Sequence, residues 1–342
     1  MNPSMMNAAV LVAHGKPLQL ACLPVPKPGS GEILVRLQAC GVCHTDVHIW
    51  QGDVRPVDDP KPFVLGHEGV GRVVELGGGV DNWKIGEPIG VPWLHDTCQI
   101  CDECISGAEP FCQKQRAHGL NVPGAFAEHV VVDSRFAVRL PEGLDPLQTA
   151  PVMCAGVTAF GAIRRANVRI GETVAIFGCG GLGLYAVQIA VRAGARVIGI
   201  DRDPEKLRHA RELGAAATFL ADDTLDEAFD AEHRAHACIN FAPTAATWKA
   251  MISAIRPRGR IVAAAMVLQN VPLNQEWLTA TGVTITGTSV GTRTEMQQTV
   301  AIHAARPLRN EIVPITLNDA TMALQALADG RAAGRFVIDF RQ

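Results

Sequence analysis

Four cysteines lie within fifteen residues of this chain, at Cys98, Cys101, Cys104 and Cys112. At these spacings four thiolates can surround one tetrahedral Zn²⁺ ion. Two disulfides or a coincidence of buried thiols are alternatives, but in a reducing compartment such a run is more often metal-binding, and iron–sulfur ligation is the main rival to zinc. A bacterial iron–sulfur cluster is disfavoured, because its fourth cysteine follows after three residues and precedes proline, whereas here seven residues intervene and Gln113 follows. Since four thiolates fill the coordination shell, the pattern predicts a structural zinc site.

A second set of metal-binding side chains cannot belong to the first. Cys43 and His67 are candidate ligands, and a catalytic zinc needs three protein ligands with a fourth position open. Spacing alone does not choose the third ligand, and a spare cysteine is usually just a small buried hydrophobic residue. The remaining cysteines are Cys22, Cys40, Cys154, Cys179 and Cys238. One site with four protein ligands, together with a second site that keeps a coordination position open, indicates a zinc enzyme.

Residues 40–44 read Cys-Gly-Val-Cys-His, which is also the attachment motif of a c-type haem and contains a CxxC dithiol. Haem attachment needs an exported chain, and the first residues show no basic segment followed by a long apolar one. A redox dithiol needs a thioredoxin-like βαβ setting, whereas Cys43 follows a barrel-type strand. We therefore retain zinc binding as the interpretation.

Length and composition predict two domains, since 342 residues with 48% hydrophobic content are sufficient for two cores. The net charge of −3 gives no electrostatic reason to expect nucleic-acid or membrane binding. No uninterrupted apolar run reaches membrane-spanning length. We expect a cytoplasmic protein with neither a nucleic-acid nor a membrane partner.

The pattern of apolar and turn-forming residues changes between the two halves of the chain. From about residue 7 to 150, short apolar runs separated by Gly and Pro predict a β-rich, barrel-like lobe, with strands at 8–13, 33–39, 70–76, 128–132 and 137–140. From about residue 172, strands alternate with helices, which is typical of a parallel α/β sheet. The expected strands are 174–177, 196–200, 237–241 and 260–264, and the expected helices are 182–193, 204–213 and 245–255. A last strand is expected at 335–340, and we expect this tail to rejoin the first lobe.

The α/β half opens with a glycine-rich dinucleotide fingerprint. Gly178, Gly180 and Gly183 follow a predicted strand and open a predicted helix, and Asp201 ends the next strand. Gly178 permits a tight turn, Gly180 lets the backbone approach a pyrophosphate, and Gly183 allows close helix packing. The helix N-terminus, with the main chain of Gly181 and Leu182, offers amide donors to phosphates. Asp201 would accept a hydrogen bond from a ribose 2′-hydroxyl.

The residue after Asp201 bears on the choice of cofactor. Arg202 could attract a 2′-phosphate, but the charge of Asp201 would repel that group. At contact distance the repulsion is the larger effect. The pair therefore favours NAD over NADP.

Four segments occur together and in order: GVCHTD at 41–46, GHEGVG at 66–71, the four-cysteine lobe, and GCGGLG at 178–183. This combination resembles the zinc-dependent alcohol dehydrogenases of the medium-chain dehydrogenase/reductase superfamily, of the yeast and bacterial type, over residues 7 to 340. The resemblance implies an α/β fold with a doubly wound Rossmann sheet and a GroES-like β-rich catalytic domain. The implied domains are a catalytic domain at 1–153 with two zinc sites, an NAD-binding domain at 154–290, and a return to the catalytic domain at 291–342. It also implies a homotetramer.

The resemblance assigns the catalytic zinc to Cys43, His67 and Cys154. It implies that Asp46 orients the His67 ring, as metal-bound histidines commonly require, and that Glu68 sits behind the metal. Polyol dehydrogenase relatives usually carry a carboxylate at the third position, so a cysteine there favours simple alcohols.

Further roles follow from the same resemblance. Thr45 and His48 resemble a proton relay that leads from the alcohol, by way of the cofactor ribose, to solvent. The resemblance also places four residues against the cofactor: His44 and Arg335 at its phosphates, and Thr158 and Val290 at its nicotinamide. Trp50 and Trp93 resemble the tryptophans that line the alcohol site and leave room only for short chains.

The expected function is zinc-dependent oxidation of small primary alcohols to aldehydes, with hydride transfer to NAD, and the reverse reduction. Bulkier aromatic or secondary alcohols and NADP remain alternatives, as does a non-catalytic, zinc-stapled binding protein. A zinc-free quinone reductase of the same superfamily is disfavoured, because both candidate ligand sets are intact.

Overall fold

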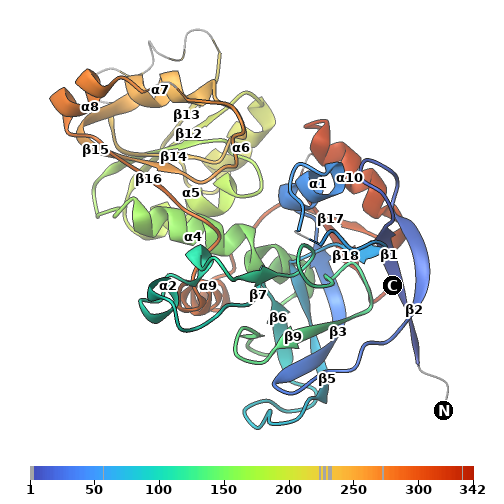
Figure 1. Cartoon of the computed structure of the whole chain (residues 1–342). Coiled ribbons are helices and arrows are strands. Elements are labelled where there is room, and N and C mark those ends of the chain that lie inside the picture. The colour runs from blue at the N-terminus through green and yellow to red at the C-terminus, as the bar shows by residue number, and fades with distance from the viewer. Residues whose placement is uncertain are drawn as a thin grey trace. The chain divides into compact units, whose positions relative to one another are not determined.

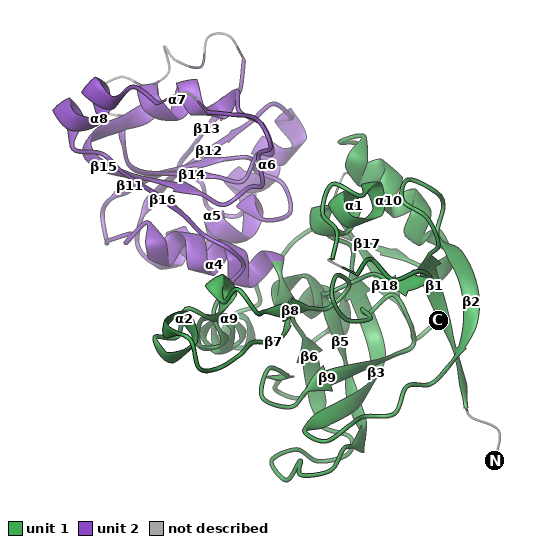
Figure 2. Ribbon diagram, viewed as in Figure 1, with its two compact units in different colours: residues 1–154, 292–342 green, residues 155–291 purple. Residues whose placement is uncertain are grey.

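The computed structural model describes residues 4–56, 58–222, 225, 229, 233–271, 273–332 and 334–342. It contains two compact units (Figure 2). Unit 1 comprises Met1–Cys154 and Thr292–Gln342, and unit 2 comprises Ala155–Gly291. These boundaries lie one residue from those predicted. The α/β class, with a β-rich unit and a parallel-sheet unit, is confirmed.

The main sheet of unit 1 has seven strands in the order β10-β6-β5-β3-β18-β17, with β9 also paired to β3. They are β3 (Glu32–Gly41), β5 (Gly69–Leu76), β6 (Pro88–Val91), β9 (His129–Asp133), β10 (Val138–Arg139), β17 (Ile312–Ile315) and β18 (Arg335–Asp339). Strand β18 comes from the C-terminal segment and runs antiparallel to β3, with Ile338 opposite Cys40. The prediction that the tail rejoins the first lobe is therefore confirmed.

A smaller sheet in unit 1 joins β2 (Gln19–Pro24), β1 (Met5–Leu11) and β4 (Phe63–Val64), and a short ribbon joins β7 (Leu94–Asp96) to β8 (Arg116–Ala117). Strand β1 begins three residues before the predicted one, because its register with β2 extends to Met5 opposite Pro24. Such strand ends are set by a partner that is distant in sequence. Both sheets contribute to one core, in which Leu11, Ile33 and Phe126 are fully buried.

Apart from α9, the helices of unit 1 are short. They are α1 (His44–Gln51), α2 (Asp102–Ile105), η1 (Glu109–Phe111), α3 (Pro146–Thr149), η2 (Ala150–Met153), α9 (Arg293–Ala305), η4 (Leu317–Asp319) and α10 (Ala320–Ala328). Helix α1 begins directly after Cys43, and it ends at Gly52, whose φ of 86° is a left-handed conformation that glycine adopts without strain. It packs against α10. The sequence analysis predicted no helix here, although α1 carries several of the candidate site residues.

Unit 2 is a six-stranded parallel sheet in the order β13-β12-β11-β14-β15-β16. The strands are β11 (Thr173–Phe177), β12 (Arg196–Asp201), β13 (Ala217–Leu220), β14 (Ala235–Asn240), β15 (Ile255–Ala263) and β16 (Thr284–Gly287). The helices are α4 (Ala155–Arg165), α5 (Gly183–Arg192), α6 (Pro204–Glu212), α7 (Thr247–Ala254) and α8 (Gln275–Thr281). Figure 1 shows α7 and α8 on one face of this sheet and α4 and α5 on the other. The strand order reverses between β11 and β14, and dinucleotides bind at such a switch point.

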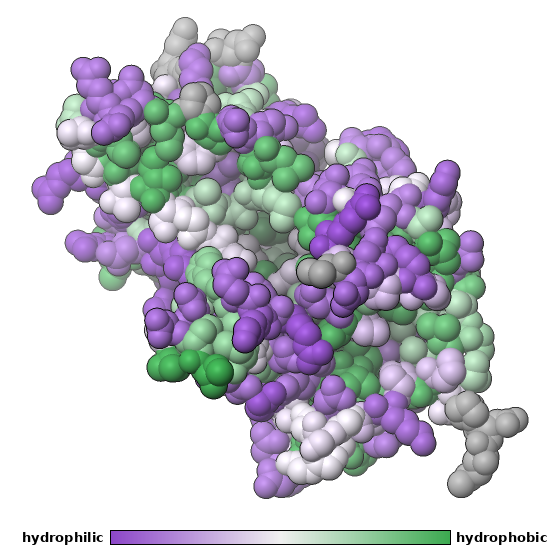
Figure 3. Space-filling view, viewed as in Figure 1, coloured by the Kyte–Doolittle hydropathy of each residue, from purple (hydrophilic) through white to green (hydrophobic). Residues whose placement is uncertain are grey.

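On the face seen in Figure 3, hydrophilic residues cover much of each unit, and hydrophobic residues occupy smaller areas between them. Exposed apolar side chains such as Ile100, Ile105 and Ile170 are ordinary on protein surfaces. Among the described residues, no single helix is long and apolar enough to cross a membrane. One bent pair of helices, Pro146–Met153 with Ala155–Arg165, could do so by length and composition alone.

Candidate active site and metal centres

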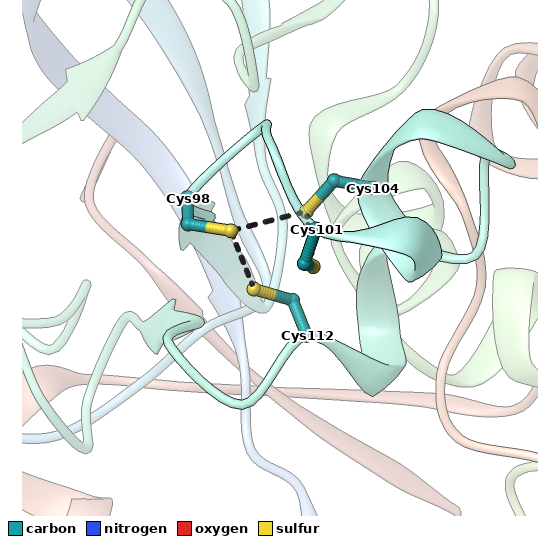
Figure 4. A group of neighbouring side chains, drawn as sticks. All are labelled: Cys98, Cys101, Cys104 and Cys112. Carbon is teal, nitrogen blue, oxygen red and sulfur yellow. Dashed lines mark hydrogen bonds between the residues drawn. The ribbon is translucent and has the colours of Figure 1, made fainter.

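The four lobe cysteines converge on one point. Figure 4 shows their side chains directed toward one another. The Sγ atoms are 3.9 Å apart for Cys98 and Cys104, 3.5 Å for Cys101 and Cys104, and 3.6 Å for Cys98 and Cys112. A tetrahedron of Zn–S bonds places sulfur atoms about 3.8 Å apart. The four side chains therefore fit a zinc ion that they would enclose completely.

The local backbone supports this arrangement. Gln99 adopts a φ of 60°, and the turn that it makes lets the chain fold back over Cys98. Main-chain N–H groups of Ile100 and Cys101 lower the pKa of Cys98 to about 6. Thiolate is the form that binds metal, so these amide donors favour the ligating state.

The second ligand set also comes together. Donor atoms of Cys43, His67, Glu68 and Cys154 all lie within 4.8 Å of one another, and these residues are buried. The Sγ atoms of Cys43 and Cys154 are 4.0 Å apart. Among the spare cysteines, Cys154 is the one that the fold brings to this set. Two sulfurs and one imidazole nitrogen are a suitable donor set for catalytic zinc.

His67 carries the clearest mark of a metal ligand. Its side chain is fully buried, and its Nε2 atom has no hydrogen-bond partner in the part of the chain that the structure describes. Its Nδ1–H group donates to Asp46 Oδ1 at 3.1 Å, so Nε2 bears the lone pair. A buried polar atom without a partner is costly unless something absent from the protein atoms satisfies it. A zinc ion would do so.

Asp46 fixes both the helix and the histidine. Its carboxylate accepts hydrogen bonds from the main-chain N–H groups of Cys43 at 2.8 Å and Gly66 at 3.3 Å, besides the one from His67. The bond from Cys43 closes the capping box of α1. One buried carboxylate therefore ties together the segments that carry the first two ligands.

Glu68 forms a buried ion pair with Arg335 from β18. The Arg335 Nη2 atom donates to Glu68 Oε1 at 2.5 Å and also contacts Oε2. Burial raises the pKa of Glu68 to about 7, and the charge of Arg335 opposes that rise. A Cβ atom on Gly41 would lie 1.9 Å from Glu68 Oε2, so the close packing requires glycine there.

The sequence analysis did not predict this pair. It placed Glu68 behind the metal and Arg335 at the cofactor phosphates, without relating the two residues. The two are 267 positions apart in sequence, and only the pairing of β18 with β3 brings them together. In unit 1 the Arg335 side chain is buried against Glu68, and its contact with phosphate stays a prediction.

The predicted relay residues share one face of α1. Thr45 and His48 are three residues apart, and the ring of His44 meets that of His48 edge-on at 5.4 Å. His48 Nδ1 lies 3.0 Å from Asp53 Oδ2. Sequence reasoning missed Asp53, whose position just past the Gly52 turn was the available signal. This contact is partly exposed to solvent, so it orients the ring more than it stabilises the fold.

The two tryptophans occupy different environments. The ring of Trp93 meets the ring of His67 edge-on, with centroids 5.0 Å apart. Trp50 instead belongs to the main core of unit 1, is 5% exposed, and donates from Nε1 to the carbonyl of Lys16 at 2.6 Å. Trp50 therefore packs in the core of unit 1, and its place at the alcohol site stays a prediction, while Trp93 remains a candidate pocket wall.

In unit 2 the three glycines of the fingerprint meet distinct physical requirements. Gly178 has a φ of 92°, and a Cβ there would lie 2.8 Å from the main-chain nitrogen of Ala242, after β14. A Cβ on Gly183 would lie 1.8 Å from the Gly178 carbonyl oxygen, so only glycine permits this close packing. A Cβ on Gly180 would meet no atom within 4 Å, which leaves space for a bound group to approach the backbone. Helix α5 begins at Gly183, directly after Gly181 and Leu182.

Asp201 lies beside this turn. Its carboxylate accepts hydrogen bonds from the main-chain N–H groups of Cys179 at 2.7 Å and Asp203 at 3.0 Å. The next residue, Arg202, is exposed. The structure therefore holds one acidic group at the fingerprint, and each of its oxygens can still accept a further hydrogen bond.

The two residues predicted to face the nicotinamide also belong to unit 2. Thr158 is buried on α4. Val290 has a φ of 36°, which is rare for a β-branched residue and costs conformational energy. Such backbone strain clusters at ligand sites, so Val290 remains a candidate for cofactor contact.

Comparison with known proteins agrees with this geometry. The family model for the alcohol dehydrogenase GroES-like domain matches residues 29–142, and the model for zinc-binding dehydrogenases matches residues 181–305. An alcohol dehydrogenase from Moraxella sp. (strain TAE123) is 37% identical over 338 residues, covering 98% of this chain and 99% of that protein. The chain belongs to the zinc-dependent alcohol dehydrogenases of the medium-chain dehydrogenase/reductase superfamily. The predicted family is therefore confirmed.

Solved structures resemble this alcohol dehydrogenase over nearly its whole length. An NAD-dependent alcohol dehydrogenase matches with a TM-score of 0.91 and 27% identity, covering 98% of this chain and 99% of that one. A zinc-binding dehydrogenase from Sinorhizobium meliloti bound to NADP matches with a TM-score of 0.89 and 29% identity, over 98% of this chain and 99% of that one. This alcohol dehydrogenase therefore interconverts alcohols and carbonyl compounds, with zinc and a nicotinamide cofactor.

Proposed function

We propose that this alcohol dehydrogenase oxidises small primary alcohols to aldehydes with NAD and catalyses the reverse reduction, using two zinc ions per chain. The observation that supports it best is the buried Nε2 atom of His67, which has no partner among the described residues and belongs to one ligand group with Cys43 and Cys154. The lobe cysteines form a separate group that would saturate a second zinc ion. The first set suits a catalytic ion and the second a structural one.

Each residue has a distinct task in the proposed mechanism. When bound, zinc supplies a Lewis acid that lowers the pKa of an alcohol hydroxyl. Cys43, His67 and Cys154 would hold the ion, and Asp46, by accepting from Nδ1–H, leaves the Nε2 lone pair of His67 free to bind it. A nicotinamide cofactor, when bound, would supply the hydride acceptor.

Proton removal falls to two residues of α1. The Thr45 hydroxyl can accept the alcohol proton and donate its own, because a hydroxyl is donor and acceptor at once. His48 then passes a proton to solvent, and Asp53 fixes its ring by binding Nδ1, which leaves Nε2 as the basic nitrogen.

A direct assay tests the proposal. Adding ethanol and NAD⁺ to the purified, zinc-loaded protein should produce NADH, which is measured by its absorbance. A non-catalytic zinc-stapled binding protein would give no signal with any alcohol. Absence of turnover across primary, secondary and aromatic alcohols, with either cofactor, would contradict the proposed function.

The preference for NAD rests on Asp201, and Arg202 with the NADP-bound relative keeps NADP as the second candidate. Replacing Asp201 with glycine removes the repulsion toward a 2′-phosphate and leaves Arg202 to attract it. We expect the ratio of kcat/KM with NADP to that with NAD to rise by about 10-fold or more. In the same background, Arg202→Ala should remove most of this gain. A wild-type enzyme that already prefers NADP would show that Arg202 outweighs Asp201.

Substrate size is expected to depend on Trp93. Its ring borders His67, so Trp93→Ala should create space next to the catalytic ligands. We expect kcat/KM for benzyl alcohol relative to ethanol to rise by about 10–200-fold or more, since one methylene that fits or clashes in an apolar pocket already changes this quantity by that range. Trp83→Phe, a change at a buried tryptophan in the core of unit 1, should lower stability and leave this ratio unchanged. A wild-type preference for bulky or secondary alcohols would contradict the proposed pocket.

We also propose a homotetrameric assembly and a cytoplasmic location, on the family resemblance. Light scattering should then give a mass near four times the 36.4 kDa of the chain. A monomeric mass would contradict the assembly.

A further inference from the structure

Two buried histidines lie outside both ligand sets, and the mechanism does not use them. His118 is 0% exposed and His95 is 4% exposed. Their rings meet edge-on with centroids 4.8 Å apart, and His95 Nδ1 lies 3.1 Å from His118 Nε2. Burial lowers the pKa of His118 to about 3 and also lowers that of His95, so both rings stay neutral.

Their hydrogen bonds define which nitrogen carries each proton. His118 Nδ1 lies 2.9 Å from the carbonyl oxygen of Pro92, which can only accept, so Nδ1 carries the proton and donates it. Nε2 is then unprotonated and accepts from His95 Nδ1–H. Because Nε2 carries no proton, it does not donate to the carbonyl of Val131, from which it lies 3.3 Å away. His95 therefore binds the ring nitrogen of His118 that does not bind Pro92, and this second hydrogen bond fixes the orientation of the ring.

The pair secures a short piece of backbone between β6 and β7. The ring of His118 binds the carbonyl of Pro92, and its main-chain N–H donates to the carbonyl of Trp93 at 2.9 Å. Residues 92 and 93 lie outside the named strands, and buried carbonyls need a partner. One residue thus satisfies two successive carbonyls, and the second of these belongs to the residue whose ring borders His67. An apolar side chain could fill the same volume but could not bind the Pro92 carbonyl.

We propose that His118, held in place by His95, is a positioning residue for Trp93 and thereby determines which alcohols reach the catalytic ligands. This inference rests on the proposed role of Trp93 as a pocket wall. An indole ring extends far from its own backbone, so a small rotation at residue 93 is amplified into a larger displacement at the ring edge. A pocket that sorts substrates by single carbons responds to such a shift.

The test is a double-mutant cycle on the zinc-loaded enzyme, measuring kcat/KM for benzyl alcohol relative to ethanol. His118→Ala should raise this ratio by about 3–10-fold. His118→Asn should restore a ratio near that of the wild type, because its Nδ2–H group lies close to the place of the imidazole Nδ1–H. In the Trp93→Ala background, His118→Ala should add little, since the ring it positions is gone. His95→Ala, which keeps the bond to Pro92, should change the ratio in the same direction as His118→Ala but by less.

His303→Ala is the matched control. His303 is also a buried histidine of unit 1, but its ring nitrogens bind Thr149 Oγ1 and the main-chain nitrogen of Leu308. The His303→Ala change should lower the melting temperature without changing the ratio of kcat/KM for benzyl alcohol to that for ethanol. A crystal structure of the His118 variants supplies a readout that does not need turnover: in His118→Ala the Trp93 ring should leave its edge-on contact with His67, and in His118→Asn it should keep it.

Three results would overturn the inference. The ratio could stay unchanged in His118→Ala although Trp93→Ala raises it, the two effects could multiply in the double variant, or the Trp93 ring could stay in place in the His118→Ala structure. An unchanged ratio in Trp93→Ala itself would be a different failure, because it would refute the pocket wall and, with it, the specificity role of His118. If His118→Ala does not fold, the ratio and the ring position in His95→Ala decide the same question.

Discussion

Cys154→Ala is expected to remove one of two zinc ions per chain and to lower kcat/KM for ethanol by more than about 10³-fold, since losing even a residue that orients a ligand costs 10–100-fold. The physical reason is that Cys43 and His67 alone leave the ion with two protein donors, one fewer than a catalytic zinc needs. Elemental analysis and steady-state kinetics on the same sample measure both effects.

A buried cysteine elsewhere provides the control. Cys238 is 0% exposed on β14, in the core of unit 2, and stands in no metal-binding group that the described residues form. Cys238→Ala should keep both zinc ions and activity within about threefold of the wild type, although a small cavity will cost some stability. Full activity with two zinc ions in Cys154→Ala would show that another residue completes the catalytic set.

The lobe zinc is expected to behave differently from the catalytic one. Under mild chelation the ion at the open site should leave first and take activity with it, because one of its positions exchanges with solvent. Four thiolates should retain the lobe ion. Zinc content and residual activity, followed through a chelator titration, should therefore fall together to one ion per chain. One zinc ion or fewer in fully active protein would contradict the two-site proposal.

Removing one lobe cysteine should instead act on stability. Structural zinc contributes about 10–16 kcal/mol in small zinc peptides, so even a fraction of this lost in Cys104→Ala should lower the melting temperature by more than about 10 °C. The variant should keep its catalytic zinc. Ser106→Ala is a matched control on the same lobe, because its side chain is exposed and its hydroxyl donates to the Glu103 carbonyl within the same turn, so the melting temperature should shift by about 1 °C or less. An unchanged melting temperature in Cys104→Ala would show that the lobe does not stabilise unit 1 through metal.

Local features of the site could be read from the chain itself. Three of the lobe cysteines fall within seven residues, so chain geometry alone keeps their thiols near one another. The same holds for the glycines of the fingerprint, which meet the demands of one turn between β11 and α5. The alternation of strands and helices predicted the parallel sheet, because buried parallel strands are nearly continuous apolar runs, and β11 is buried along its whole length with four apolar residues after Thr173.

Residues that act through distant partners could not be predicted in this way. Trp50 and Trp93 are alike in the sequence, yet one fills the core and the other borders a ligand. Helix α1 was missed because its apolar pattern is weak, and it is stabilised by the Asp46 cap and by packing against α10.

The sequence by itself determined the kinds of site this protein has: a closed set of four thiolates, an open set containing Cys43 and His67, and a phosphate-binding turn followed by an acidic residue. Each depends on residue chemistry and short spacing, which folding does not alter. Only the tertiary structure decided which cation faces Glu68 and which histidine pair lies against the backbone of Trp93, and it placed Cys154 beside Cys43 and His67 as the family resemblance implied. These partners are separated by between 23 and 267 residues and meet only where strands pair or segments pack. Pairing and packing over such distances are set by burial across the whole unit, which no local pattern encodes.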